Sequence, residues 1–513
     1  MSLFPRIRVS ESAPTLNYPV STVVRLIKAG TWLTIANLVT RILSSLTLPL
    51  LARLLGPSAL GIYSIVFATA QTGQSISSLG AEVVMHRNGA QYKTIGAESV
   101  GRLFGVGMAM VCIMSALCGL IVFIFRVPLA VHWLGRPELS TWLGIAALII
   151  LIQPLGAVPL FFLASLQDFR SFALRTSLGV FFSSAVTVAL ALRYGLRGAV
   201  AGLVVGAAGQ AIWSFLMVRP VLRDKAIRLS FHQFRQEAVA ILRLGFPYYY
   251  GNTLLGALVV LPVMGLVGRY GNLSELGYLR AAQSMATIIG FIPAAIAPAA
   301  FSYLSASLAD DVNSFRRLRI VHLRGVWGLL LMMTCPACLL LPLIIRILYG
   351  EAFSSTYKLA WISLWLSLLV GISTVLVQYL VVNGKTVRVA WVSTLGVASF
   401  CLTSMYLVPR YHATGFLIAQ VIGQLASIPF VFSPIIRDMV PEDKRLIRNL
   451  VVVTALSLAW TLWLPGLRLS WPVMVLLTIL TLILLGGYLL AWVLSPRERV
   501  RLRQLMPFRA SYA

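Results

Sequence analysis

Apolar runs of about twenty residues, each long enough to cross a bilayer, make up most of this chain. We predict such helices near residues 27–54, 60–79, 103–125, 141–164, 171–192, 196–218, 244–268, 276–305, 325–348, 358–382, 387–407, 413–435, 447–464 and 471–494. Prolines interrupt the fourth and eighth runs, and we expect them to kink these helices rather than to end them. The pattern therefore predicts an all-α polytopic membrane protein with about 14 transmembrane helices.

The first predicted helix carries a polar face within its apolar run. Thr34, Asn37, Arg41 and Ser44 recur every three to four residues, which places them within one arc of a helix. An arginine near the middle of a membrane helix costs about 2.5 to 3.5 kcal/mol on insertion scales. We therefore expect Arg41 to face a protein-lined or water-filled interior, and it is our first candidate for a substrate-binding residue.

Composition and charge narrow the class of protein. Hydrophobic residues make up 59% of the chain and charged residues 11%, which excludes a soluble globular protein. The net charge of +27 lies in short segments between apolar runs, so we predict no nucleic-acid partner. About 30 of the 42 Lys and Arg residues fall on one side if the N-terminus is cytoplasmic. We therefore predict a multi-pass membrane protein with both termini in the cytoplasm.

The chain also repeats itself. Ser177 to Gly198 matches Thr394 to Gly415 without a gap, at an offset of 217 residues, and the hairpin of residues 48–64 resembles residues 261–280. Six helices per copy is an even number, so the copies should be parallel lobes related by an axis along the membrane normal. The predicted parts are a tail at 1–24, an N-lobe at 25–218, a basic linker at 219–243, a C-lobe at 244–436, an added helix pair at 437–494 and a basic tail at 495–513.

A polar site near mid-membrane, between the two lobes, is typical of such transporters. Besides the residues named above, our candidates for lining it are Gln71, Gln74, Arg175, Tyr249, Asn252, Arg280 and Gln283. Arg175 lies close to the cytoplasmic boundary, where a charge that sets orientation is the alternative reading. None of the 15 acidic residues falls in the middle of a predicted helix, and we predict no metal or cofactor site. A positive interior favours an anionic substrate over a cationic drug.

Six segments carry a resemblance to a known family: LLARLLGPSALGIYS, LGFPYYYGN, ELGYLRAAQ, IIRILYGEAF, LVVNGKTVRVAW and LVPRYHATGF. They resemble the polysaccharide-biosynthesis flippases of the multidrug/oligosaccharidyl-lipid/polysaccharide (MOP) exporter superfamily. The resemblance covers nearly the whole chain and implies a MATE-like fold. His412 stands where members of the family usually have glycine.

The resemblance implies a function as well as a fold. It implies a flippase, not an enzyme, that moves an undecaprenyl-diphosphate-linked oligosaccharide to the periplasmic leaflet by alternating access, for O-antigen, capsule or exopolysaccharide synthesis. The expected partners are that polyprenyl-diphosphate-linked oligosaccharide, membrane lipid, a polysaccharide polymerase and glycosyltransferases. Three alternatives stay open at this point: a lipid-linked peptidoglycan precursor flippase, a drug or metabolite antiporter of the same superfamily, and a membrane glycosyltransferase or polymerase.

Overall fold

The computed structural model describes residues 20–81, 84–85, 92–165, 169–250, 254–291, 293, 296, 300, 303–304, 307–308, 311–437, 439–463 and 470–493. Within these residues every regular element is a helix, which confirms the predicted all-α class. The long elements are α1 (Val20–Ser78), α3 (Tyr92–Ile124), α5 (Ser140–Ser165), α6 (Phe169–Asp224), α7 (Phe234–Tyr249), α8 (Leu255–Tyr270), α9 (Leu273–Ile289), α11 (Val312–Leu339), α13 (Tyr357–Val382), α14 (Thr386–Arg437), α15 (Pro441–Trp463) and α16 (Trp471–Tyr488). Short elements between them are α4 (Arg126–Pro128), η1 (Leu129–Trp133), η2 (Pro137–Leu139), α12 (Leu341–Leu348), η4 (Glu351–Thr356) and η6 (Leu489–Val493).

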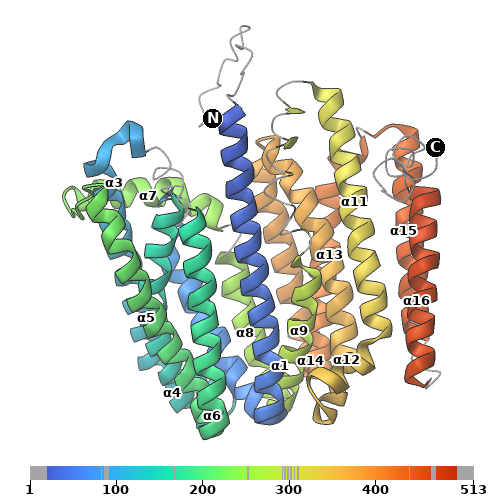
Figure 1. The fold of residues 1–513 in the computed structure, drawn as a ribbon. Coiled ribbons are helices and arrows are strands. Elements are labelled where there is room, and N and C mark those ends of the chain that lie inside the picture. The colour runs from blue at the N-terminus through green and yellow to red at the C-terminus, as the bar shows by residue number, and fades with distance from the viewer. Residues whose placement is uncertain are drawn as a thin grey trace, which may run out of the picture.

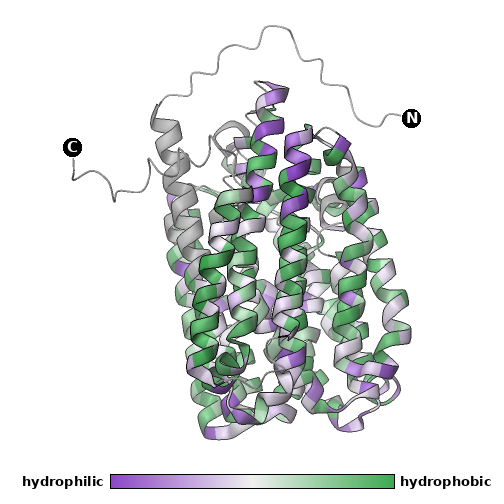
Figure 2. Ribbon diagram, turned by 90° about the vertical axis from the view of Figure 1, so that its right-hand side faces the viewer, coloured by the Kyte–Doolittle hydropathy of each residue, from purple (hydrophilic) through white to green (hydrophobic). Residues whose placement is uncertain are grey.

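The helices have the length and composition of membrane spans. Nine helices of the described chain are long and apolar enough to cross a bilayer, which confirms a polytopic membrane protein. Hydrophobic residues dominate the middle of the bundle, and hydrophilic residues are more frequent at its two ends (Figure 2). Pro154 and Pro159 lie inside the continuous helix α5, so these prolines do not end it.

Three of the long helices contain a reversal of chain direction and so hold two of the predicted spans each. α1 breaks at Gly56 (φ 73°), α6 at Gly195 (φ 57°) and α14 at His412 (φ 48°). In α6 the arms run antiparallel, because Gly202 packs against Thr187 and Gly206 packs against Ser183. The α1 and α6 reversals lie at the bottom of the bundle in Figure 1, which we call the reversal end.

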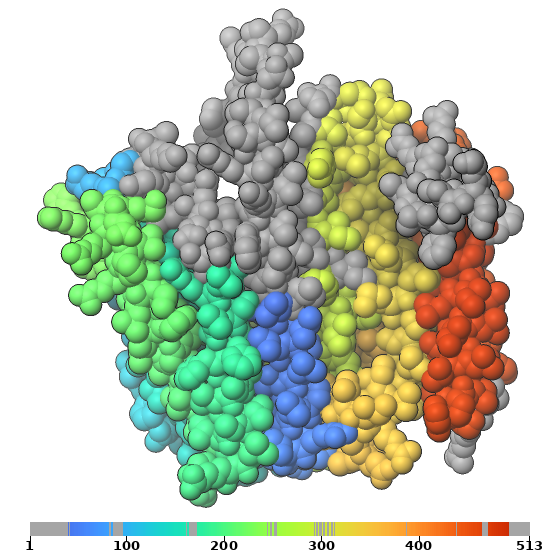
Figure 3. Space-filling view, in the orientation of Figure 1, coloured from blue at the N-terminus to red at the C-terminus, as the bar shows by residue number. Residues whose placement is uncertain are grey.

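The bundle has two halves, which we define as the N-half (residues 20–224) and the C-half (residues 234–437). One large hydrophobic cluster includes buried residues of both. The blue part of α1 stands between α6 of the N-half and the orange α12 region of the C-half (Figure 3). Helices α15 and α16 lie at the edge of the bundle (Figure 1). The indole N–H groups of Trp327 and Trp361 donate to the hydroxyls of Thr454 and Thr461 on α15, at 3.0 and 3.2 Å.

The two halves touch through a reciprocal contact at the reversal end. Gly61 packs directly on the carbonyl oxygen of Leu273, and Gly277 packs in the same way on the carbonyl oxygen of Pro57. Both pairs of equivalent residues, Gly61 with Gly277 and Pro57 with Leu273, are 216 positions apart. The side-chain oxygens of Ser58 and Ser274 have the same separation in sequence and lie 2.7 Å apart. Such exchange of equivalent contacts is the pattern that a two-fold axis produces.

Further hydrogen bonds cross between the halves at the same end. The Trp133 indole donates to the Pro262 carbonyl at 3.3 Å. The Arg136 guanidinium donates to the carbonyls of Gly268 and Gly271 at 3.2 and 3.0 Å. Arg53 of the N-half also donates to the carbonyl of Ile347. In the opposite direction, Arg269 of the C-half donates to the carbonyl of His132 at 2.7 Å. We call these contacts, with those of the glycines and serines, the junction.

Candidate functional site

A polar cavity of about 440 Å³, which we call the central cavity, lies between the two halves. Both arms of α1 and α6 form its N-half wall, and α9 forms its C-half wall. Hydroxyl and amide side chains predominate among its polar lining residues, which are Ser44, Ser45, Thr47, Gln71, Ser183, Ser184, Thr187, Gln210, Arg280, Gln283, Ser284 and Thr287. The aromatic rings of Tyr63 and Phe67 complete one wall.

Arg280 is the charged residue among the described residues that line the cavity. Its guanidinium carbon lies 4.4 Å from the centre of the Phe67 ring, which is cation–π geometry across the two halves. Its Nε atom is buried and has no hydrogen-bond partner among the described residues. No described Asp or Glu lines the cavity, so the charge of Arg280 is not neutralised there. The site is therefore electrostatically suited to an anion.

The hydroxyl groups on α9 are already engaged, and this fixes the wall around Arg280. Ser284 donates to the carbonyl of Ala281 at 2.8 Å and hydrogen bonds with the hydroxyl of Tyr349. Thr287 donates to the carbonyl of Ser284 at 2.6 Å. Among the described residues, by contrast, the amides of Gln71, Gln210 and Gln283 have no hydrogen-bond partner. Amides can donate and accept, so three of them around one cavity are suited to sugar hydroxyls.

The structure brings together some of the predicted site residues. Ser44 and Gln71 on α1 and Arg280 and Gln283 on α9 line the same cavity. The serine and glutamine come from opposite arms of α1, on either side of the Gly56 break. Two helices distant in sequence thus contribute to one site.

The other predicted site residues lie elsewhere. Gln74 lines a separate, very small pocket with residues of α3 and α5. Tyr249 is buried, with its Cβ packed beside Gly80. Arg175 donates to the carbonyl of Met217 at 3.2 Å and so ties the two arms of α6 together. The side chains of Thr34, Asn37 and Arg41, and all of Asn252, lie outside the described residues.

Sequence reasoning missed the contribution of α6. Ser183, Ser184 and Thr187 on one arm and Gln210 on the other all line the cavity. The spacing of the first three follows one face of a helix and was a usable signal. Gln210 carried no such signal, because it reaches the same cavity only through the reversal at Gly195.

The C-half contains a smaller counterpart of this cavity, of about 290 Å³, between α8, α13 and α14. Val397, Phe400, Gln420 and Ser427 line it, and each follows a lining residue of the central cavity by 217 positions. No charged residue is among its lining residues in the described chain. The two related cavities therefore differ in charge, and the cationic one is at the interface of the halves.

Sequence comparison gives two findings. The profile of the family described as "Polysaccharide biosynthesis protein" matches residues 26–308. The succinoglycan biosynthesis transport protein ExoT of Rhizobium meliloti (strain 1021) is 27% identical over 247 residues, which are 48% of this chain and 47% of that protein. The chain thus aligns with about half the length of this curated relative.

Solved structures share the fold. The lipid II flippase MurJ in an inward closed conformation matches with a TM-score of 0.70 and 14% identity, over 88% of this chain and 97% of that one. An inward-facing multidrug resistance MATE family transporter of the MOP superfamily matches with a TM-score of 0.60 and 15% identity, over 79% of this chain and 100% of that one. These likenesses confirm the predicted MATE-like fold.

Proposed function

Because the chain belongs to the polysaccharide biosynthesis protein family of the MOP superfamily, we propose that it is a flippase for a polyprenyl-diphosphate-linked oligosaccharide. The observation that carries this proposal is Arg280, an arginine in a polar cavity between two halves of a membrane protein, with no described carboxylate lining that cavity. The substrate's diphosphate supplies the missing negative charge. The name of the succinoglycan transport relative supports a polysaccharide precursor as the cargo.

Each part of such a substrate has a complementary part in the cavity. The planar guanidinium of Arg280 binds phosphate oxygens through paired N–H donors. The amides of Gln71, Gln210 and Gln283 bind sugar hydroxyls. Arg41 precedes Ser44 and Ser45 by three and four residues in α1, so its position in the sequence predicts a second cation on the same face. The polyprenyl chain stays in the lipid.

The movement we propose is alternating access, in which the halves rock about the cavity. The junction closes the reversal end, so the substrate enters from the opposite end in this state. We propose that the opposite end is cytoplasmic, as the distribution of Lys and Arg in the sequence predicts, and that the membrane is the bacterial inner membrane. An inside-negative potential then assists outward movement of the diphosphate by about 2.3 kcal/mol per charge per 100 mV.

A flipping assay on variants tests this function. Purified protein is reconstituted in vesicles that contain a fluorescent polyprenyl-diphosphate oligosaccharide, and the fraction of glycan accessible from outside is followed over time. We expect Arg280→Gln to lower the initial rate by about tenfold or more, the factor that corresponds to one lost charge-assisted hydrogen bond. Arg280→Lys keeps the charge but not the paired donors, so its rate should lie between that of the unmodified protein and that of Arg280→Gln.

Gln74→Ala is the matched control, because Gln74 lies on the same arm of α1 as Gln71 but outside the cavity. Its rate should equal that of the unmodified protein. An Arg280→Gln protein that is correctly folded and flips the glycan at the original rate would contradict the proposal. A lipid-linked peptidoglycan precursor serves as a second substrate in the same assay. Faster flipping of that precursor would assign the protein to the alternative pathway.

A further inference from the structure

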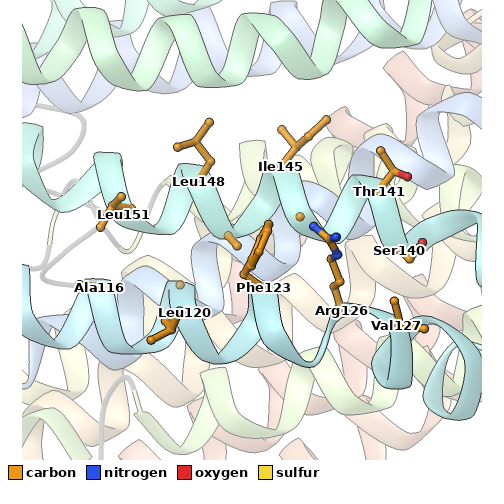
Figure 4. A pocket seen from close by; sticks show the side chains of 13 residues that line it. Ala116, Leu120, Phe123, Arg126, Val127, Ser140, Thr141, Ile145, Leu148 and Leu151 are labelled. Atoms are coloured by element: carbon orange, nitrogen blue, oxygen red, sulfur yellow. The ribbon is translucent and has the colours of Figure 1, made fainter.

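A groove open at the surface runs between α3–α4 and α5, and it shares no lining residue with the central cavity. Its volume of about 710 Å³ lies within the range of about 300–1,000 Å³ that is usual for ligand pockets. Leu120, Phe123, Leu148 and Leu151 line it and are all exposed (Figure 4). Exposed side chains of this kind in membrane spans contact acyl chains, so a lipid chain is the natural occupant of the groove's length.

One end of the groove is polar and positively charged. Arg126, Ser140 and Thr141 lie together at that end (Figure 4), and no described acidic residue is among the lining residues. The Arg126 guanidinium carbon lies 4.2 Å from the centre of the Phe123 ring. The described residues provide no carboxylate that forms an ion pair with Arg126. The guanidinium therefore has donors available for an anion from outside the protein.

Gly144 makes space for the Arg126 side chain in this groove. A Cβ atom at this position would lie 3.3 Å from a terminal guanidinium nitrogen of Arg126 and 3.9 Å from the Phe123 ring. A larger side chain would therefore occupy the space beside the charge. A substitution at Gly144 can therefore fill the groove, because the heavy atoms nearest to the added Cβ belong to the side chains of Arg126 and Phe123 and not to the backbone.

The depth of the charged end matches that of a lipid phosphate. The apolar span on α3 ends at Ile124, and the next apolar span begins at Pro137. Arg126 and Ser140 therefore lie at the level where the bilayer passes from acyl chains to headgroups. The same loop forms part of the junction through Trp133 and Arg136, so this level belongs to the leaflet at the reversal end.

We propose that this groove binds an anionic phospholipid of the leaflet at the reversal end, with its phosphate on Arg126 and one acyl chain between α3 and α5. Charge complementarity favours this occupant, because a zwitterionic lipid brings its own headgroup cation close to Arg126, and a lipid without phosphate brings no anion. The hydroxyls of Ser140 and Thr141 provide further donors to phosphate or glycerol oxygens. The site holds a lipid beside the N-half and is separate from the transported cargo.

Native mass spectrometry of the full-length protein in detergent tests the proposal. Palmitoyl-oleoyl phosphatidylglycerol and the matching phosphatidylcholine are titrated separately, and the fraction of protein carrying one lipid is measured. We expect phosphatidylglycerol to be retained more strongly, and Arg126→Gln to weaken its retention by about fivefold, the factor for one interfacial arginine. Gly144→Leu should weaken retention of both lipids. Arg193→Gln, which removes an exposed arginine from the α6 reversal, is the matched control and should behave as the unmodified protein.

Equal retention of the two lipids, or unchanged retention in both Arg126→Gln and Gly144→Leu, would overturn the proposal. Size-exclusion profiles and thermal unfolding confirm that each variant is folded. Undecaprenyl phosphate is the third probe. If it binds more tightly than phosphatidylglycerol and is displaced by the same two substitutions, the groove takes a polyprenyl chain, and the assignment to phospholipid is wrong.

Discussion

His412 has a backbone conformation that glycine adopts at the equivalent position. Its φ and ψ are 48° and −123°, close to the 57° and −135° of Gly195, which lies 217 residues earlier. A side chain in this region is strained by about 1–3 kcal/mol. The imidazole Nδ1 lies 3.1 Å from the Glu275 carboxylate, which also accepts from the backbone N–H of Ala413 at 3.2 Å. These contacts offset part of the strain and tie α14 to α9.

The strain can be measured with a pair of substitutions at this position. We expect His412→Gly to be more stable than His412→Ala by about 1 kcal/mol or more, because both lose the contact with Glu275 but only alanine keeps a Cβ in a glycine conformation. Thermal unfolding of the two proteins in the same detergent is the measurement. Equal melting temperatures would mean that the turn relaxes and stores no strain.

The central cavity gives a second contrast at the scale of single residues. Gln71 and Gln74 are one helical turn apart, but only Gln71 faces the cavity. We expect Gln71→Ala to weaken binding of an oligosaccharide by about 1 kcal/mol, since one hydrogen bond to the glycan is lost. Gln74→Ala should leave binding unchanged. Tryptophan fluorescence titration with the soluble glycan compares them, and equal affinities would place the sugar elsewhere.

This contrast also shows the limit of sequence reasoning for a site. A polar residue in an apolar helix is predicted to point away from lipid, and Gln71 and Gln74 meet that condition equally. Which side faces the other half depends on how α1 rotates against α6 and α9. That rotation is set by packing, so periodicity alone could not separate the two.

At the scale of elements, helix α11 begins with a carboxylate cap. The Asp311 carboxylate accepts from the backbone N–H groups of Asn313 and Ser314 at 3.0 and 2.9 Å. These hydrogen bonds hold the pKa of the Asp311 carboxyl below its ordinary value. A lowered pKa in the folded state means that the cap stabilises the protein above the ordinary pKa of about 3.9 and is lost as the pH falls through the lowered value.

The cap predicts a pH-dependent difference between two proteins. We expect Asp311→Ala to lower the melting temperature at pH 7, where the carboxylate is charged. The difference should shrink as the pH falls below about 3.9, because the unmodified protein then loses the same interaction. Asp311→Asn, which keeps a capping acceptor without the charge, should show a weaker pH dependence. A constant difference across the pH range would rule out the carboxylate as its cause.

The sequence predicted the paired spans well where a glycine or proline marks the turn. Gly56 and Gly195 separate spans that the apolar runs had already placed on either side. The helix bounds predicted from the sequence were less accurate around α11. That helix begins at Val312 rather than near residue 325, and the chain turns at Leu340 before α12. Hydropathy could not show either feature, since the early part of α11 is basic and the turn lies inside an apolar run.

At the scale of the whole molecule, the repeat in the sequence predicts two lobes but not how they touch. The offset near 217 residues gave the equivalent positions. It could not show that Gly61 and Gly277 each pack on a backbone carbonyl of the other half. It also could not show that the central cavity takes its N-half wall from α1 and α6 and its charge from α9, since this follows from the docking of one half on the other.

The junction permits a direct test of movement. In a protein with the native cysteines replaced, Ser58→Cys and Ser274→Cys should form a disulfide on oxidation, because the serine oxygens are 2.7 Å apart. We expect the disulfide to stop flipping, since the reversal end can then no longer open, and a reductant to restore it. Each single cysteine variant with oxidant is the control. Full activity of the cross-linked protein, with the bond verified by gel mobility, would exclude opening at this end.

The chemistry of the junction also determines what can regulate it. Its described contacts use glycine and serine groups, an indole N–H, and arginines that donate to carbonyls. Serine does not ionise in the physiological range, and arginine keeps its proton there. None of the donors and acceptors named above therefore changes its charge in that range, although Arg136 also lies 3.9 Å from the Glu138 carboxylate. A change of pH within that range should therefore leave these described contacts intact, and any effect of protons on this closure would have to act through other groups.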